Sequence, residues 1–199
     1  GLQQLLKRFD IPVYTKQGTW REIQDKLVVP KNQLIELTKG SLTLGNLIVE
    51  PFAVSHDAAD PIGINVFSGK DKATVVTDTG IISDDILHRI DDSTLLVLEA
   101  NYDPHMLRFG PYQPFLKQRV ASDEGHLSNE MAAQALLMMK RPDFMQVILA
   151  HRSENNNNAV LVTQTIGKML VDGGVRIGPE MKLQHGQPNE IVSMQSIKR

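Results

Sequence analysis

The stretch Val75-Val76-Thr77-Asp78-Thr79-Gly80 divides the sequence into two parts with different patterns. Before it, short runs of apolar and β-branched residues are separated by turn residues such as Lys39-Gly40 and Gly45-Asn46, which predicts a series of strands. These predicted strands cover residues 33–37, 41–43, 47–54, 62–67 and 73–77. After Gly80, helical and strand-like segments alternate. The combination predicts an α+β protein, a sheet sandwich with helices on its outer faces.

The second part contains two strongly apolar segments, Leu95-Leu96-Val97-Leu98 and Val147-Ile148-Leu149-Ala150, which predict buried strands. Ser128 or Asn129 is placed to cap a helix, and Gly173-Gly174 to end another. The predicted helices cover residues 83–90, 112–121, 129–139 and 159–171. Two further strands are predicted over residues 180–184 and 190–194.

The beginning of the chain has the spacing of a helix and no initiator methionine. Thr19 and Glu22 have the spacing of a capping box, which predicts a second helix start. The predicted order is helix, strand, helix, over residues 2–9, 11–14 and 19–27. We therefore expect residues 1–199 to form one domain that is incomplete at its N-terminus.

The composition excludes several classes of protein. Hydrophobic residues make up 41% and charged residues 22% of the 199 residues, which is typical of a globular domain. The net charge of −2 provides no overall basic field for nucleic acid or an anionic membrane, so a nucleic-acid substrate would need a local patch or bound cations. There is no cysteine, so a metal site must use His, Asp or Glu. Without an apolar spanning segment or a signal peptide, a cytoplasmic location is expected.

Three polar clusters follow predicted strands, and they centre on His56, Asp78 and His151. Each has an ordinary structural interpretation, since a histidine after a strand is often a surface residue and Asp-Thr-Gly is a frequent turn. Together they predict a shared site, because strand ends gather at one edge of a sheet. Imidazoles and a carboxylate suit zinc, manganese or iron, and two such cations sharing a carboxylate promote hydrolysis.

The sequence resembles the metallo-β-lactamase-fold hydrolases, and in particular their bacterial YycJ/WalJ-like branch. The phrases that carry the resemblance are Val54-Ser55-His56-Asp57-Ala58-Ala59, Thr77-Asp78-Thr79-Gly80, Leu98-Glu99-Ala100-Asn101-Tyr102-Asp103, Gly125-His126-Leu127-Ser128-Asn129 and Ala150-His151. They occur in the family's order over most of the chain. The resemblance implies a four-layered αββα sandwich, two divalent metal ions and hydrolysis of phosphodiesters, especially 5′-to-3′ exonuclease action on DNA.

By this resemblance, His56 and His151 are metal ligands and Asp78 is the carboxylate that bridges two metals. The family's His-x-His-x-Asp-His block, which supplies the other ligands, is absent from these residues. Each metal would then keep one histidine and Asp78, fewer than the three protein ligands that catalytic zinc usually has. We therefore expect the two ions, zinc, manganese or iron, to be poorly retained by this chain.

Further residues are candidates for substrate contact or proton transfer. His126 precedes a predicted helix N-terminus, where backbone donors favour anions, and is a candidate proton donor or phosphate contact together with Ser128 and Asn129. The alternative is a plain helix cap with His126 packed locally. Arg152 stands where the family usually has an apolar residue, and it either clamps a phosphate or is a surface side chain.

Two weaker patterns and two alternative functions remain. Glu99 and Asp103 either orient a ligand histidine or are ordinary loop residues. The basic residues Arg108, Lys117 and Arg119 form either a nucleic-acid track or a solvated helix face. The main hypothesis is a metal-dependent nuclease with a nucleic-acid substrate. The alternatives are a hydrolase of small esters and an inactive fragment that acts as an interaction module, in which case a homodimer is one possible assembly.

Overall fold

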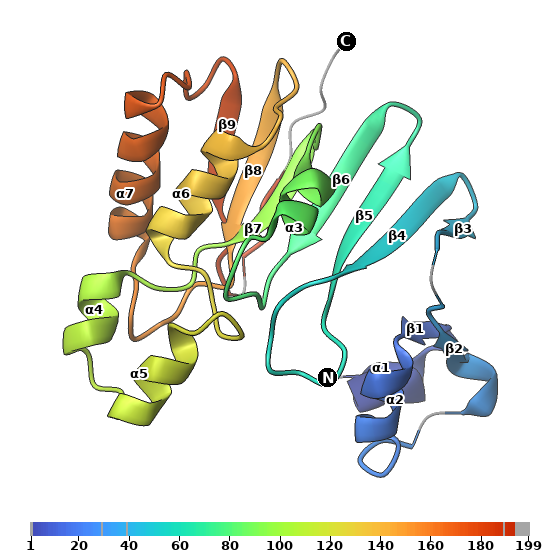
Figure 1. Ribbon diagram of the computed structural model, residues 1–199. Helices are drawn as coiled ribbons and strands as arrows, with labels where there is room; N and C mark the ends of the chain where they lie inside the picture. Colours follow the sequence, from blue (N-terminus) through green and yellow to red (C-terminus); the bar gives the residue numbers. More distant parts are fainter. Residues whose placement is uncertain (1, 29, 39, 189, 194–199) are drawn as a thin grey trace.

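The computed structural model describes residues 2–28, 30–38, 40–188 and 190–193, and its centre is a seven-stranded sheet (Figure 1). The strand order is β3-β4-β5-β6-β7-β8-β9. The strands are β3 (Leu42–Leu44), β4 (Leu47–Ala53), β5 (Ile62–Ser68), β6 (Asp71–Val76), β7 (Leu95–Glu99), β8 (Met145–Ala150) and β9 (Met181–His185). Pairing is antiparallel from β3 to β6 and parallel from β6 to β9. The change of pattern predicted around Asp78 is therefore a change of strand pairing at β6.

Local chemistry explains the antiparallel half. Short turns join β3 to β4 and β5 to β6, and each contains a glycine with positive φ, Gly45 at 63° and Gly69 at 59°. Glycine adopts this left-handed conformation without steric cost, so it permits a tight hairpin. The alternation of more and less buried residues along β5 and β6 matches a sheet that packs on one face.

Helices connect the parallel strands, as parallel pairing requires. Figure 1 shows α3, α6 and α7 on one face of the sheet, while α4 and α5 lie below them at its lower edge. The helices are α3 (Asp84–Ile90), α4 (Pro104–Phe109), α5 (Pro114–Val120), α6 (Asn129–Met138) and α7 (Ala159–Asp172). The core between sheet and helices includes Leu96 and Leu98 of β7, with Leu136 of α6 and Ile166 of α7, all fully buried. Each such side chain stabilises the fold by about 1.5–3 kcal/mol.

The opposite face of the sheet is apolar but only partly buried. Val75, Val97 and Ile148 are aligned across β6, β7 and β8, and Val75 is 38% exposed. The large sheet carries its helix layer, α3, α6 and α7, on the other face. A partly buried apolar face is the surface on which a second sheet packs in a sandwich.

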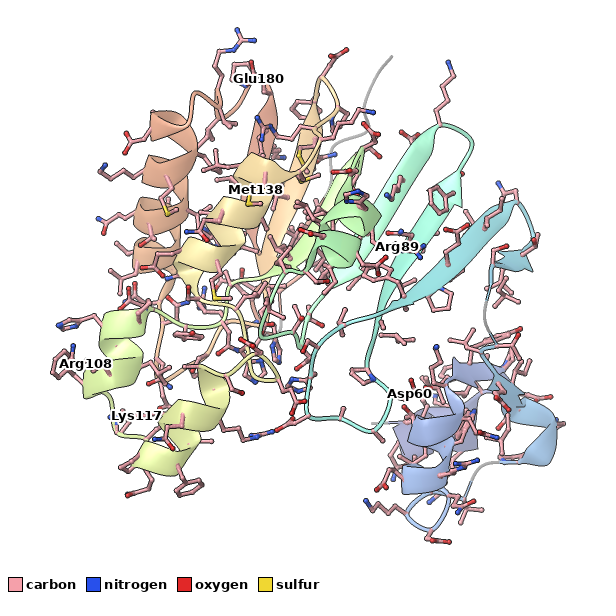
Figure 2. All side chains as sticks on the ribbon, in the orientation of Figure 1. Asp60, Arg89, Arg108, Lys117, Met138 and Glu180 are labelled. Carbon is pink, nitrogen blue, oxygen red and sulfur yellow. The ribbon has the colours of Figure 1, made fainter. Side chains whose placement is uncertain are left out.

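Residues 2–28 and 30–36 form a small unit beside the sheet (Figure 1). Its elements are α1 (Leu2–Arg8), β1 (Val13–Thr15), α2 (Gln17–Ile23), the 3-10 helix Lys31–Gln33 and β2 (Leu34–Glu36), with β1 and β2 parallel. Asp60, labelled in Figure 2 in the loop between β4 and β5, links this unit to the sheet. Its Oδ2 accepts a hydrogen bond from the Gly18 amide at 3.2 Å.

Two local predictions were wrong, and one helix was missed. The helix start at Thr19 was wrong, because α2 begins at Gln17 after Lys16, and the Thr19 hydroxyl reaches the Asp60 carbonyl at 3.5 Å instead of capping. Helix α4 was missed, although Asp103 caps it by accepting from the Met106 amide and Pro104 follows at its first turn. The strand predicted over 190–194 is absent from residues 190–193, and residue 194 lies outside the described residues.

The remaining predicted elements are confirmed with small shifts of their ends. Ser83 caps α3 and Ser128 caps α6 through their side chains, and Gly173 ends α7. The helix predicted over 112–121 is confirmed as the shorter α5. No helix in the described parts of the chain is long and apolar enough to cross a membrane.

Candidate metal and substrate site

The candidate site lies where four strands end at one edge of the sheet. Asp78, Glu99 and His151 follow or end the parallel strands β6, β7 and β8. His56 follows β4, which runs in the same direction as β6 because two antiparallel pairings separate the two strands. Four positions that are distant in sequence therefore meet, as expected at the carboxyl ends of parallel strands.

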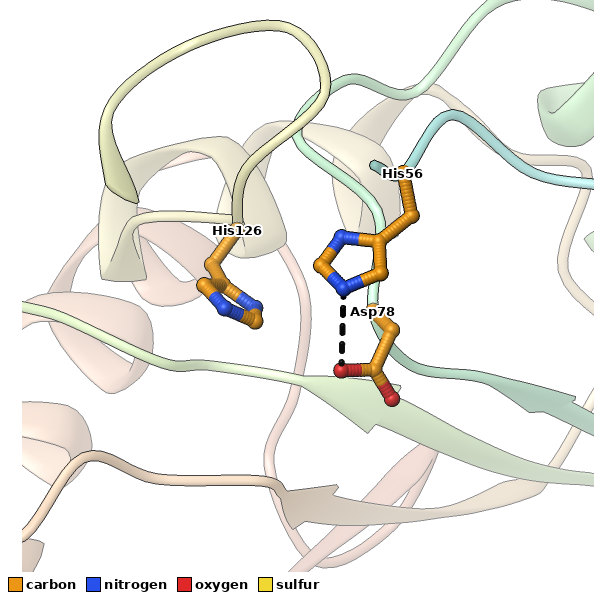
Figure 3. A group of neighbouring side chains, drawn as sticks. All are labelled: His56, Asp78 and His126. Atoms are coloured by element: carbon orange, nitrogen blue, oxygen red, sulfur yellow. Dashed lines mark ion pairs between the residues drawn. The ribbon is translucent and has the colours of Figure 1, made fainter. Parts of the chain in front are cut away.

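Asp78 lies between two imidazole rings. Its Oδ1 is 3.7 Å from Nε2 of His56, the pair joined in Figure 3, and 3.5 Å from Nε2 of His151. Nδ1 of His56 is 3.0 Å from the Gly125 carbonyl, which only accepts hydrogen bonds, so Nδ1 is the donor and Nε2 faces Asp78. One carboxylate oxygen with an imidazole nitrogen on either side is a donor set that fits two cations sharing a bridging ligand.

Glu99 is a fully buried carboxylate that organises the histidines. Its Oε1 accepts hydrogen bonds from Nδ1 of His126 and Nδ1 of His151, each at 2.7 Å, and its Oε2 accepts from the Thr79 amide at 3.1 Å. Burial by itself would raise the pKa of Glu99, but the hydrogen bonds from the two histidines outweigh it and the pKa is lowered. Glu99 in turn raises the pKa of His151. Holding the Nδ1 proton leaves Nε2 free for a metal.

The backbone is unusual at two of the predicted ligands. Asp78 and His151 have positive φ values of 55° and 51°, and Asp92 is the other non-glycine residue with positive φ in the described ranges. This conformation costs roughly 1–2 kcal/mol for a residue with a side chain. The Asn101 side chain opposes that cost at His151 by donating to its carbonyl at 2.8 Å. Strained backbone of this kind is concentrated at functional sites.

His126 lies closer to the ligands than its sequence position indicates. Its ring lies beside that of His56 (Figure 3), with 5.1 Å between the two ring centres, and 5.2 Å separate its ring centre from that of His151. His56, Asp78 and His126 each offer one possible ligand atom, and these three atoms lie within 4.8 Å of one another. The same is true of Glu99, His126 and His151. The sequence predicted one histidine and Asp78 for each metal and left His126 out. No sequence spacing relates His126 to the ends of the strands.

Ser128 and Asn129 are buried, which does not favour the substrate contacts expected for them. The Ser128 hydroxyl, in a residue 4% exposed, accepts from the Met131 amide. Asn129 is fully buried, and its side chain exchanges hydrogen bonds with that of Asn157 at 3.2 and 2.8 Å. Both side chains hold the site loops together, and the substrate contacts expected for them stay a prediction. Asp103, expected either to orient a ligand histidine or to be an ordinary loop residue, is the cap of α4.

A polar cleft of about 360 Å³ opens beside the histidines. Its lining includes Asn101, Tyr112, Arg119, His126, His151 and Arg152. A second cleft of about 350 Å³ continues past His151 and Arg152 to Gly186 and Pro188. Arg152 therefore lines both clefts next to a predicted ligand. Arg119 pairs with both carboxylate oxygens of Asp57, and this hydrogen bonding lowers the pKa of Asp57.

The fold and this site define a class of protein. Residues 1–151 match the model of the beta-lactamase superfamily domain, and the chain belongs to this family of metal-dependent hydrolases, as the resemblance implied. The chain is 32% identical to exodeoxyribonuclease YycJ of Bacillus anthracis and 29% identical to exodeoxyribonuclease WalJ of Streptococcus pneumoniae. Each comparison covers 99% of this chain and 75% of the relative. These relatives confirm the predicted YycJ/WalJ-like branch.

A solved structure confirms the fold independently. The metallo-β-lactamase fold protein YhfI from Bacillus subtilis superposes with a TM-score of 0.64 at 14% sequence identity. The superposition covers 92% of this chain and 67% of that protein. At such low identity the similarity shows the fold alone.

Proposed function

We propose that this chain carries part of the two-metal centre of a nuclease that removes nucleotides from DNA in the 5′-to-3′ direction. The observation that carries the proposal is the position of the Asp78 carboxylate oxygen between Nε2 of His56 and Nε2 of His151. The names of the two bacterial relatives support DNA as the substrate. The polar cleft beside the histidines, with Arg152 in its wall, fits a phosphodiester better than an apolar ester.

His56, Asp78 and His151 would hold two divalent cations. His126 lies near enough to add a nitrogen atom beside His56 and Asp78 or beside Glu99 and His151. When bound, such cations lower the pKa of a water molecule and offset charge on phosphoryl oxygens. Imidazole and carboxylate donors suit zinc, manganese and iron alike. Glu99 fixes the orientation of His151 and His126 but is itself buried beneath them.

The remaining roles belong to His126 and Arg152. Nδ1 of His126 donates to Oε1 of Glu99 at 2.7 Å, which fixes the orientation of the imidazole ring. In this proposal Nε2 of His126 gives a proton to the leaving oxygen of the cleaved phosphodiester. Arg152 has a guanidinium group that can hold a phosphate through two parallel hydrogen bonds. It lines both clefts and so lies beside the path of the strand.

The test is hydrolysis of DNA labelled at the 5′ end or at the 3′ end, with RNA and p-nitrophenyl esters compared in parallel. We expect mononucleotides to be released from the 5′ end in the presence of Mn²⁺ or Zn²⁺, and Asp78→Asn to abolish release. Equal hydrolysis by wild-type protein and Asp78→Asn would refute the proposal. Preferential hydrolysis of the ester would favour the small-ester alternative, and no hydrolysis by metal-loaded protein would favour an interaction module.

A further inference from the structure

Residues 104–122, here called the α4–α5 projection, have a charge distribution unlike the rest of the chain. They contain Arg108, Lys117 and Arg119, of which Arg119 is paired with Asp57, and no acidic residue, whereas the whole chain has a net charge of −2. Figure 1 shows α4 and α5 at the lower edge of the molecule, and Figure 2 labels Arg108 and Lys117 there. A protein with a negative net charge needs such a local positive patch to bind a polyanion.

The projection also exposes aromatic rings. Phe109 is 66% exposed and Phe115 is 70% exposed, although phenylalanine is normally buried. The Arg108 guanidinium lies 5.3 Å from the centre of the Phe109 ring, and the His105 ring centre lies 4.6 Å from it. Aromatic faces beside guanidinium groups are the surfaces on which unpaired bases stack.

The projection is held firmly on the end of β7. Tyr102, Leu107 and Val120 form a small core of their own beneath α4 and α5. Nζ of Lys117 donates to the Arg108 carbonyl at 2.8 Å, which ties α5 to the end of α4. A preformed surface of this kind binds without the entropic cost of ordering a loop.

The projection is continuous with the site. Tyr112 and Arg119 of the projection line the same cleft as His126, His151 and Arg152. The Tyr112 hydroxyl is 3.4 Å from Nδ2 of Asn155, which lies in the loop that follows His151. A strand lying on the projection would therefore lead directly to the predicted metal ligands.

We propose that the α4–α5 projection binds the single-stranded part of a nucleic-acid substrate adjacent to the cleaved phosphodiester. Bases stack on Phe109 and Phe115, and Arg108 contacts backbone phosphates. Single strands are specified because bases paired in a duplex do not offer their faces to protein rings. The inference rests on the proposed nuclease function for its substrate class, but binding can be measured without hydrolysis.

The binding experiment uses the full chain in EDTA with fluorescent oligonucleotides of about a dozen nucleotides. Stacking on each base contributes about 1–3 kcal/mol, so Phe109→Ser with Phe115→Ser should weaken single-strand binding by at least about 10-fold. The matched control is Val160→Ser with Val171→Ser, which removes two similarly exposed apolar side chains from α7. Circular dichroism and the unfolding midpoint of each variant check that the fold is retained.

The kinetic experiment separates the projection from the metal centre. The ratio of kcat/KM for the oligonucleotide to kcat/KM for bis(p-nitrophenyl) phosphate should fall by at least about 10-fold in Phe109→Ser/Phe115→Ser. Wild-type protein should gain affinity as the oligonucleotide is lengthened from a dinucleotide, whereas the double variant should gain little.

The outcomes distinguish this inference from the proposed function. Oligonucleotide binding that depends on the two phenylalanines, without any hydrolysis, would support the projection and refute the nuclease. Hydrolysis of DNA with unchanged binding and an unchanged ratio in the double variant would refute the projection alone. Equal losses of affinity for duplex and single-stranded oligonucleotides in the double variant would also overturn this inference. So would binding to phosphatidylserine vesicles that requires the two phenylalanines, if oligonucleotide binding does not require them.

Discussion

The buried carboxylate of Glu99 accepts a hydrogen bond from Nδ1 of His151 at 2.7 Å, which directs Nε2 of His151 toward Asp78. The same Glu99 oxygen accepts from Nδ1 of His126. A single side chain at the end of β7 thus sets the ring orientation of two histidines from other elements. Because Glu99 holds the Nδ1 atoms of both imidazole rings, changes at Glu99 should act through metal affinity.

We predict that Glu99→Gln weakens metal binding by about 10–100-fold, because a neutral amide orients the imidazole less strongly and lowers its basicity. Isothermal titration of metal-free protein with Zn²⁺ or Mn²⁺ measures the effect. Glu124→Gln, which changes an exposed carboxylate in the loop before His126, is the control. Unchanged metal affinity in Glu99→Gln would show that Glu99 supports packing only.

His126 and His151 should respond differently to substitution. We predict that His151→Ala removes bound metal, whereas His126→Ala keeps it and lowers kcat by about 100–10,000-fold. The loss in His126→Ala should be smaller for p-nitrophenyl phosphodiesters, because nitrophenolate leaves without a proton. Metal content by mass spectrometry and kcat for both substrates are the measurements. Loss of metal in His126→Ala would identify His126 as a ligand instead of a proton donor.

Asn157 should be important for stability, because it is 4% exposed and its amide donates to the carbonyls of Ala100 and Asn101 and to Asn129 Oδ1. We predict that Asn157→Ala lowers the free energy of unfolding by about 2–4 kcal/mol, since several buried groups lose their partner. Urea unfolding of metal-free protein measures it. Asn155→Ala, at an exposed position in the same loop, should change stability by less than about 0.5 kcal/mol.

Arg152 should contribute to substrate binding through charge. We predict that Arg152→Ala raises KM for DNA and reduces the slope of log affinity against log salt by about 1, because one phosphate contact is lost. Binding of DNA at several salt concentrations in EDTA gives the slope. Arg89→Ala on α3, which removes a partly exposed guanidinium far along the chain, is the control. An unchanged slope in Arg152→Ala would leave Arg152 without a role in phosphate binding.

Elements with a strong local signal were predictable. The apolar runs of β7 and β8, the Ser128 cap and the Gly173 stop depend on neighbouring residues, so their positions follow from short stretches of sequence. The start of helix α4 has a signal of the same kind in Asp103-Pro104, a cap followed by proline at the first turn. The false helix start at Thr19 arose because the Thr19 hydroxyl contacts Asp60, a tertiary contact without a sequence pattern.

The candidate site divides in the same way. His56, Asp78 and His151 could be selected from the sequence because each follows an apolar strand, and residues after parallel strands gather at one edge. Only the tertiary structure brought His126 beside them, made Glu99 a shared acceptor for two rings, and buried Ser128 and Asn129 away from the cleft. Strand and cap signals act within a few residues along the chain. Imidazole orientation and burial depend instead on side chains that are distant in sequence and meet only when β6, β7 and β8 pair.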